Sequence, residues 1–156
     1  MGRIPYARML ASLSADDRQA IQHALQLTKT EQFVQRALHT LSDGERQRIF
    51  IAKALAQSTP IILLDEPTAF LDFPTKVATL RLLRHLAHEE EKAVLLSTHD
   101  VELALQFADT LWLLRPDGIT EGSPLQLARN GAIAHFFGSE GISFDAETMR
   151  FNYLTP

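Results

Sequence analysis

The chain has 156 residues, of which 46% are hydrophobic and 22% charged, and its formal net charge is −4. This length and composition predict one folded domain; the mild acidity argues against nucleic-acid binding, and no apolar run approaches the roughly 18 residues of a membrane span. The absence of cysteine excludes disulfides, thiolate catalysis and cysteine-bound zinc, and with no secretion signal in the sequence we expect a cytosolic location.

The first part of the chain predicts short helical structure. Ser14 is followed by Asp16 and Asp17, which is typical of a helix start: a hydroxyl caps the backbone and acids meet the positive end of the helix dipole. Two broken apolar stripes follow. Together they predict a helical region from Ser14 to about Leu38.

A second helix start lies in the segment Leu-Ser-Asp-Gly-Glu at 41–45. Ser42 and Glu45 are three residues apart and fit a capping box, in which each side chain bonds the other's free backbone N–H. A serine and Gly44 at a helix N-terminus also present hydrogen-bond donors to an anion such as phosphate. A capping box alone is more often structural, so both interpretations stay open on these residues.

From Thr40 onward, helices alternate with short, wholly apolar runs, as in a parallel sheet covered by helices on both faces. The runs lie at 61–64, 93–96 and 111–114. Between the first two, apolar residues spaced by threes and fours follow Pro74. We therefore expect a helix with Pro74 at its first position, completing a βαβ unit.

The third run is followed by Arg-Pro-Asp-Gly at 115–118, which predicts a turn and a hairpin with a second strand at 119–121. Ser123 and Pro124 predict the start of another short helix. The final stretch, 138–156, has little periodicity, and we expect an irregular or lightly structured tail.

Polar residues follow two of the expected strands. Asp65 and Glu66 come directly after the first strand, where ligands gather in open α/β sheets and paired carboxylates can hold Mg²⁺ and polarise water. A strand that simply ends in polar residues explains the pair equally well. His99 follows the second strand and is expected at the same edge, although a lone loop histidine is usually just a solvated side chain.

Taken in order, these segments strongly resemble the nucleotide-binding subunit of ATP-binding cassette (ABC) transporters. The four blocks are Leu-Ser-Asp-Gly-Glu-Arg-Gln-Arg at 41–48, Ile-Ile-Leu-Leu-Asp-Glu-Pro-Thr at 61–68, Phe-Leu-Asp at 70–72 and Ser-Thr-His-Asp at 97–100. In that family they are the signature, Walker B, D-loop and switch-histidine motifs. The segment 1–6 is also similar to the entry into the helical subdomain of importers for iron-siderophores, haem and cobalamin.

The resemblance implies an α/β, P-loop NTPase-like (ABC ATPase) fold with a parallel sheet and a helical subdomain. It also implies ATP and Mg²⁺ as cofactors, with Asp65 holding magnesium through water. Glu66 would polarise the attacking water, and His99 would contact the γ-phosphate. Phosphoryl transfer depends mainly on positioning and charge stabilisation, which suits residues held at one sheet edge.

The same resemblance implies a head-to-tail dimer. Ser42, Gly44 and Glu45 would contact the ATP held by the partner subunit, with Glu45 accepting a hydrogen bond from a ribose hydroxyl, and Asp72 would couple the two sites. Asp43 and Glu45 stand where the commonest signature has glycine and glutamine. An acid at 43 weakens phosphate binding unless it points away.

One motif of the family is absent. The sequence contains no Gly-x-x-x-x-Gly-Lys-Ser/Thr loop, since none of its seven glycines is followed by lysine. We therefore expect the C-terminal part of such a subunit, without the phosphate loop and the strand before it. The expected parts are 1–40, the remainder of the helical subdomain; 41–137, the signature helix and C-terminal ATPase core; and 138–156, a tail.

Loss of the phosphate-loop strand should separate the runs 93–96 and 111–114 or make them pair in a new way. Either an apolar groove and unpaired backbone groups are then exposed, or another chain fills the gap. We therefore expect the isolated chain to be inactive and poorly stable or oligomeric.

The function expected from the sequence is the ATP-binding subunit of an importer of iron-siderophore, haem or cobalamin type. Its expected partners are a second ATPase subunit and an integral-membrane permease, at the cytoplasmic face of the cell membrane, with no nucleic acid and no insertion of its own. One alternative is a non-catalytic regulatory or interaction module derived from such an ATPase. Another is a cassette ATPase of DNA repair or translation, whose coiled-coil insertions and basic linkers the sequence lacks.

Overall fold

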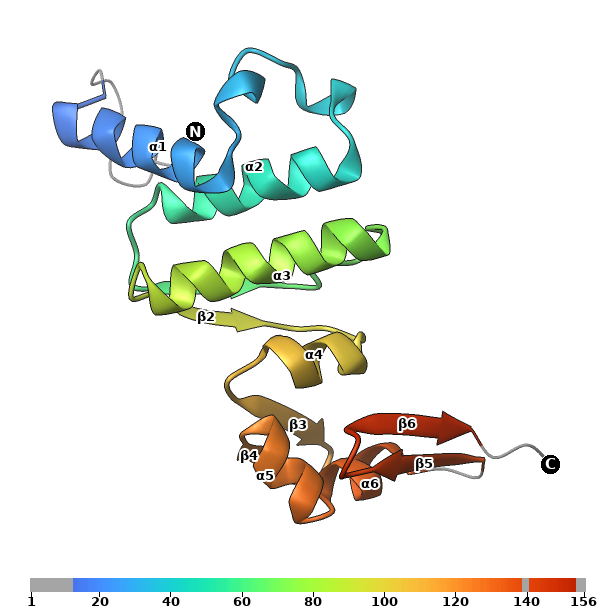
Figure 1. Ribbon diagram of the computed structural model, residues 1–156. Coiled ribbons are helices and arrows are strands. Elements are labelled where there is room, and N and C mark those ends of the chain that lie inside the picture. Colours follow the sequence, from blue (N-terminus) through green and yellow to red (C-terminus); the bar gives the residue numbers. More distant parts are fainter. Residues whose placement is uncertain (1–12, 139–140, 154–156) are drawn as a thin grey trace. The chain divides into compact units, whose positions relative to one another are not determined.

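The computed structural model describes residues 13–138 and 141–153 (Figure 1). The segment 1–6, similar to an importer subdomain, lies outside the described residues. The chain forms two compact units, Met1–Thr98 and His99–Pro156. The subdomain boundaries expected from the sequence, at 40 and 137, stay predictions.

The first described element of unit 1 is helix α1 (Ala15–Thr28), and the expected helix start at Ser14 is confirmed. The structure adds a capping box there: Ser14 Oγ accepts the Asp17 N–H at 3.1 Å, and Asp17 accepts the Ser14 N–H. The prediction of helix as far as Leu38 is wrong. Lys29 adopts a left-handed conformation with φ 54°, and its N–H bonds back to the last turn, which ends the helix. The 3₁₀ turns η1 (Glu31–Phe33) and η2 (Leu38–Thr40) follow.

The remainder of unit 1 is a strand–helix–strand arrangement preceded by a helix. The elements are α2 (Asp43–Leu55), β1 (Ile61–Leu64), α3 (Phe73–His88) and β2 (Ala93–Leu96). The expected βαβ unit is confirmed, because β1 and β2 pair in parallel. Helix α3 begins at Phe73, one residue before the predicted start, because Asp72 is the N-cap; Pro74 takes the second helical position.

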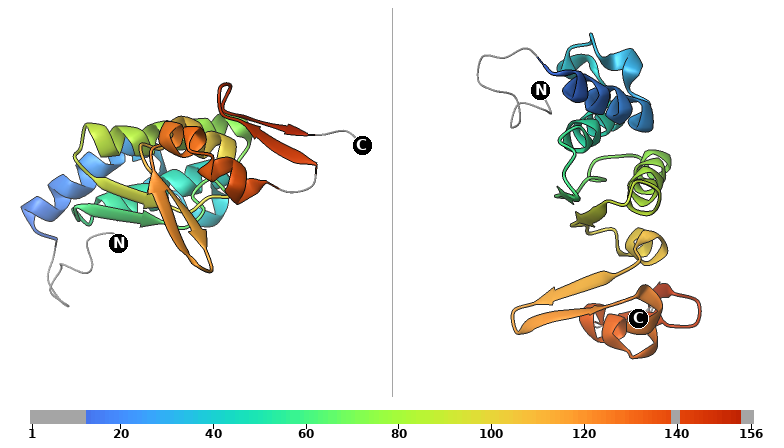
Figure 2. Two further views of the ribbon diagram at one scale, coloured as in Figure 1. Left: turned by 90° about the horizontal axis from the view of Figure 1, so that it is seen from below. Right: turned by 90° about the vertical axis from the view of Figure 1, so that its left-hand side faces the viewer.

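Helix α3 lies against the β1–β2 pair (Figure 2), and the core of unit 1 forms on that side. Its members are Ala24, Ile51, Leu55, Ala56, Ile62, Leu83 and Leu86. The opposite face is open: Ile61 is 55%, Leu63 70% and Leu95 43% exposed. In the part of the chain that the structure describes, the sheet is therefore covered on one face, and the prediction of two covered faces is wrong.

Unit 2 contains short helices and two hairpins. The elements are α4 (Val101–Phe107), β3 (Leu111–Arg115), β4 (Gly118–Gly122), α5 (Pro124–Arg129), α6 (Ala132–Phe137), β5 (Ile142–Asp145) and β6 (Arg150–Tyr153). The β3–β4 hairpin and the start of α5 were expected and are confirmed. None of the helices within 13–138 and 141–153 is long and apolar enough to cross a bilayer.

The tail 138–156, expected to be irregular or lightly structured, is not irregular where the structure describes it, because β5 and β6 form a short antiparallel hairpin. Asp145 Oδ1 accepts the N–H groups of Glu147 and Thr148 and so organises the turn without glycine or proline. Phe144 and Phe151 face each other with ring centroids 5.0 Å apart and pack on the core of unit 2. Two aromatic residues across a short hairpin give too little periodicity to detect in a sequence.

Strands β2 and β3 lie in separate sheets. Among the described residues, β2 pairs with β1 and β3 pairs with β4, each in a two-stranded sheet. This confirms the separation expected for the runs 93–96 and 111–114. Each two-stranded sheet keeps edges with unpaired backbone groups, which are free to pair with another strand.

Ile62 and Leu63, neighbours in β1, can test whether the sheet is covered on one face only. Ile62 is 2% exposed and Leu63 70%, so Ile62→Ala should lower the free energy of unfolding by about 2–5 kcal/mol, whereas Leu63→Ala should change it by less than about 0.5 kcal/mol. Urea unfolding at low protein concentration measures both. A loss at Leu63 as large as that at Ile62 would mean that this face is covered in solution.

Candidate functional site

The carboxyl ends of β1 and β2 meet at one edge of unit 1 and hold the predicted acidic pair. Leu64 pairs with Leu96, and the next residue, Ser97, donates its N–H to the Leu64 carbonyl at 3.0 Å. The Ser97 hydroxyl donates to Asp65 Oδ1 at 2.6 Å and accepts the Glu66 N–H at 2.9 Å. Ser97 thus binds both acidic residues as a clamp, a role that the sequence analysis did not predict. The position of Ser97 directly after the second strand was the feature that could have indicated it.

The backbone between this clamp and α3 is unusual. Glu66 and Phe70 have φ values of 44° and 62°, a left-handed conformation that non-glycine residues rarely adopt. Asp65 and Glu66 are exposed, and Phe70 is 95% exposed. Ser97 therefore holds Asp65 by one carboxylate oxygen and Glu66 by its backbone N–H, and both acidic residues are exposed to a ligand.

His99 begins unit 2. Its side chain is exposed, and its carbonyl accepts the Val101 N–H at 3.1 Å. The next residue, Asp100, caps α4 by accepting the Leu103 N–H at 3.4 Å. Because His99 belongs to the other compact unit, a site shared with the acids of unit 1 stays a prediction.

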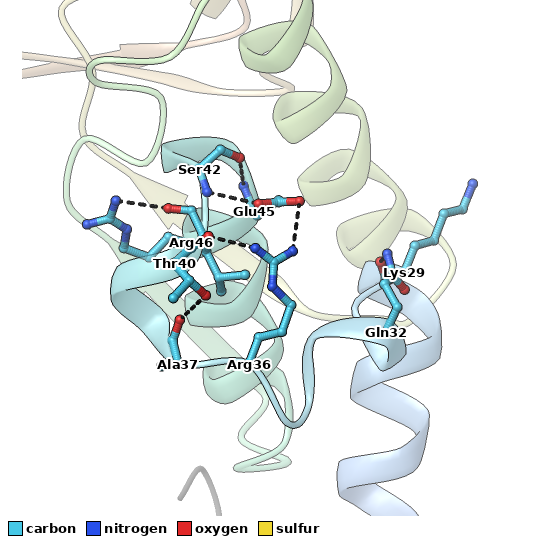
Figure 3. A network of polar contacts seen from close by, with 9 residues as sticks. Lys29, Gln32, Arg36, Ala37, Thr40, Ser42, Glu45 and Arg46 are labelled. Carbon is cyan, nitrogen blue, oxygen red and sulfur yellow. Dashed lines mark hydrogen bonds and ion pairs between the residues drawn. The ribbon is translucent and has the colours of Figure 1, made fainter.

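The start of α2 forms the expected capping box (Figure 3): the Ser42 N–H donates to Glu45 Oε2 at 2.8 Å, and the Glu45 N–H donates to Ser42 Oγ at 3.3 Å. Arg36 Nη1 lies 3.8 Å from the other carboxylate oxygen. The Ser42 N–H above all, with smaller contributions from the charges of Arg36 and Arg48, holds the pKa of Glu45 below its ordinary value. Both oxygens of Glu45 thus have partners within the chain, and its ribose contact stays a prediction.

Asp43, the acid expected to weaken phosphate binding, has an arginine of its own. Arg46 Nη2 donates to Asp43 Oδ1 at 3.1 Å and to the Leu41 carbonyl at 3.3 Å. The two residues are three positions apart on the helix and both side chains are exposed, so their ion pair contributes little to stability. It does offset the negative charge at this end of α2.

The N-termini of α2 and α3 touch each other. Asp72 caps α3 by accepting the Thr75 N–H at 3.1 Å, and hydrogen bonds from the Thr75 hydroxyl and N–H lower the pKa of Asp72. A Cβ on Gly44 would lie 2.6 Å from Cγ2 of Thr75, so only glycine allows this approach. The structure therefore brings Ser42, Gly44 and Asp72 to one end of unit 1.

The acidic edge fits a magnesium ion that arrives with a nucleotide. Within 13–138 and 141–153, no group of three or more His, Asp or Glu side chains could hold a metal ion by itself. Mg²⁺ commonly takes one or two carboxylates and completes its shell with water and phosphate. Ser97 engages one oxygen of Asp65, and the second can accept a hydrogen bond from metal-bound water.

Comparisons with known proteins agree with the order of the motifs. A family model described as ABC transporter matches residues 6–69. A petrobactin import ATP-binding protein of Bacillus anthracis is 37% identical over 140 residues, which cover 89% of this chain and 51% of that protein. An iron(3+)-hydroxamate import ATP-binding protein of Bacillus subtilis is 37% identical over 127 residues, 81% of this chain and 47% of that protein. The chain spans about half the length of the curated relatives it matches.

Solved structures show the same fold. An ABC transporter in an inward-facing conformation superposes with a TM-score of 0.80 at 27% identity, covering 99% of this chain and 64% of that chain. A dimeric ATP-binding cassette with bound ADP and phosphate superposes with a TM-score of 0.59 at 32% identity, covering 74% of this chain and 50% of that one. The expected ABC ATPase fold is thereby confirmed.

Gly44→Ala should destabilise the chain by about 1 kcal/mol, although alanine is the better helix former, because the new methyl group overlaps Thr75 Cγ2. Turning Thr75 away would break its hydroxyl bond to Asp72. Adding Thr75→Ser removes the overlapping methyl and keeps the hydroxyl, so the double variant should recover the loss. Thermal or urea unfolding measures all three variants; a stabilised Gly44→Ala would contradict the close approach.

The helix caps should lose stability in acid. Glu45 and Asp72 have pKa values below their ordinary 4.5 and 3.8 in the folded chain, so their contribution is complete above those values. It is lost as the pH falls through the lower folded-state pKa values. Amide hydrogen exchange at the first turns of α2 and α3 should report this. Glu45→Gln and Asp72→Asn, which keep capping side chains, should remove the pH dependence; its persistence would assign it to other groups.

Proposed function

Because this chain belongs to the family of ABC transporter ATP-binding proteins, we propose that it is the signature-bearing part of an importer's ATP-binding subunit. Petrobactin, achromobactin, iron(3+)-hydroxamate and cobalamin appear in the names of its relatives. The proposed cargo is therefore a metal chelate or a corrinoid: an iron-siderophore, haem or cobalamin. The observation that carries the ATPase assignment is the clamp that Ser97 forms on Asp65 and Glu66.

The proposed chemistry is hydrolysis of ATP. Asp65 would hold Mg²⁺ through water, and the ion supplies charge neutralisation for the phosphates when it is bound. Glu66 would polarise the attacking water, which requires its carboxylate to stay exposed beside the fixed Asp65, as it is here. His99 would contact the γ-phosphate.

The adjoining starts of α2 and α3 are proposed to act on a nucleotide that a second subunit holds. Ser42 and Gly44 would contact its phosphates and Glu45 its ribose, while Asp72 would couple the two sites. The approach of Gly44 to Thr75 supports this arrangement, because Thr75 also donates to Asp72 and so links the signature to the D-loop. The remaining proposed partner is a membrane permease at the cytoplasmic face of the cell membrane.

One alternative is a non-catalytic module derived from such an ATPase, which would pair with a complete subunit through the capped start of α2. Both functions use the start of α2. They differ at Glu66, which only the catalytic function requires.

We expect the purified chain alone to bind and hydrolyse no ATP. Mixed with an intact ABC ATP-binding subunit whose own signature serine is replaced, it should restore phosphate release, because it supplies the missing signature. Ser42→Ala should abolish this stimulation, and Ser14→Ala, which removes the equivalent cap of α1, should not.

Lack of stimulation by the unaltered chain would contradict the proposed pairing. The chain alone could also hydrolyse ATP and lose this activity in Glu66→Gln. That result would show that the chain holds phosphates without a phosphate loop, which contradicts the proposal that the partner subunit holds the nucleotide.

A further inference from the structure

Arg36 contacts three separate parts of unit 1. Its guanidinium carbon lies 5.6 Å from the centroid of the Phe33 ring. Its Nη2 donates to the Thr40 carbonyl at 2.6 Å, and its Nη1 lies 3.8 Å from Glu45 Oε1 (Figure 3). One side chain therefore joins η1, the end of η2 and the first turn of α2.

The charge at Glu45 explains why such a contact matters. An acid in the first turn stabilises a helix through the dipole, but it repels a phosphate brought to the same end. The positive charge of Arg36 offsets the negative charge of Glu45. Arg48, whose guanidinium carbon lies 6.0 Å from the Phe33 ring centroid, contributes a second positive charge. The two acids of the signature, Asp43 and Glu45, thus each have an arginine as a partner.

The carboxylate of Glu45 also accepts a hydrogen bond from the backbone of Ser42. Its Oε2 takes the Ser42 N–H, and Arg36 holds the opposite oxygen, so rotation of the carboxylate is restrained from both sides. The bond from Arg36 to the Thr40 carbonyl restrains the chain just before Ser42. The orientation of the capping serine therefore depends on Arg36.

We propose that Arg36 is a positioning residue: it holds Glu45 on the Ser42 N–H and fixes the start of α2 in the form that presents Ser42 to a nucleotide. This inference rests on the proposed function, because only a nucleotide at α2 gives the arrangement a use. It assigns no catalytic contact to Arg36 itself. The guanidinium acts through Glu45 and the Thr40 carbonyl.

Two variants separate charge from packing. Arg36→Met keeps an apolar stem over Phe33 and removes the charge, whereas Arg36→Lys keeps the charge. Arg84→Met makes the same change at an exposed arginine of α3 and serves as the control. Far-UV circular dichroism checks that every variant is folded.

The first measurement is an NMR titration of the Glu45 carboxyl in the isolated chain. Arg36→Met should raise the pKa of Glu45 toward its ordinary 4.5, while Arg36→Lys and Arg84→Met should leave it low. An unchanged pKa in Arg36→Met would overturn the proposal, because the residue would then act only by packing on Phe33.

The second measurement is the stimulated phosphate release described above. Arg36→Met should lower it about two- to fivefold, as expected for loss of a partly exposed ion pair, and Arg36→Lys should retain most of it. Full stimulation by Arg36→Met would overturn this inference alone. If the unaltered chain never stimulates, the proposed function fails and the nucleotide role of Arg36 fails with it, while the titration still decides the contact with Glu45.

Discussion

The parallel pairing of β1 with β2 sets the geometry of the acidic edge of unit 1. Ile62 faces the core with Leu83 and Leu86, and this burial fixes the register in which Leu64 lies opposite Leu96. A slip of one residue would turn the buried side chains to the open face, so the register is strongly specified. The same register brings the Ser97 hydroxyl between Asp65 and the Glu66 N–H. Core packing thus decides where the two carboxylates stand.

A second constraint acts where α2 and α3 begin side by side. Two helix N-termini in contact bring their positive dipole ends together, which is unfavourable unless negative groups are nearby. Glu45 and Asp72 are those groups, and each also satisfies free N–H groups of its helix. An acid in place of the family's usual glutamine at 45 therefore suits the helix pair, and Arg36 offsets its remaining charge. Local helix stability and the proposed ligand contact place opposite demands on this residue.

The sequence predicts features that depend on neighbouring residues and misses those that join distant ones. The capping boxes at Ser14 and Ser42 were predictable because both partners lie within one turn, and β1 and β2 because a wholly apolar run of four is a strong signal. The clamp by Ser97 joins residues 31 and 32 positions apart, and no local pattern reports it. The end of α1 at Lys29 depends on a backbone conformation that lysine seldom adopts. The roles of the site residues come from the order of four motifs and stay predictions.

The left-handed residues Glu66 and Phe70 have a consequence for the order in which unit 1 opens. Each non-glycine residue in this conformation raises the local free energy by roughly 1–3 kcal/mol. The connection between β1 and α3 therefore keeps a strained backbone that the surrounding contacts must stabilise. Its restraint at the strand end is the Ser97 hydroxyl, a group at the surface. Pro67 and Thr68, which follow Glu66 directly, are buried and keep the middle of this connection packed. Loss of the Ser97 bond should therefore let the backbone relax at Glu66 while β1 and β2 stay paired, so that a molecule binding the carboxylates acts on a backbone that already stores strain.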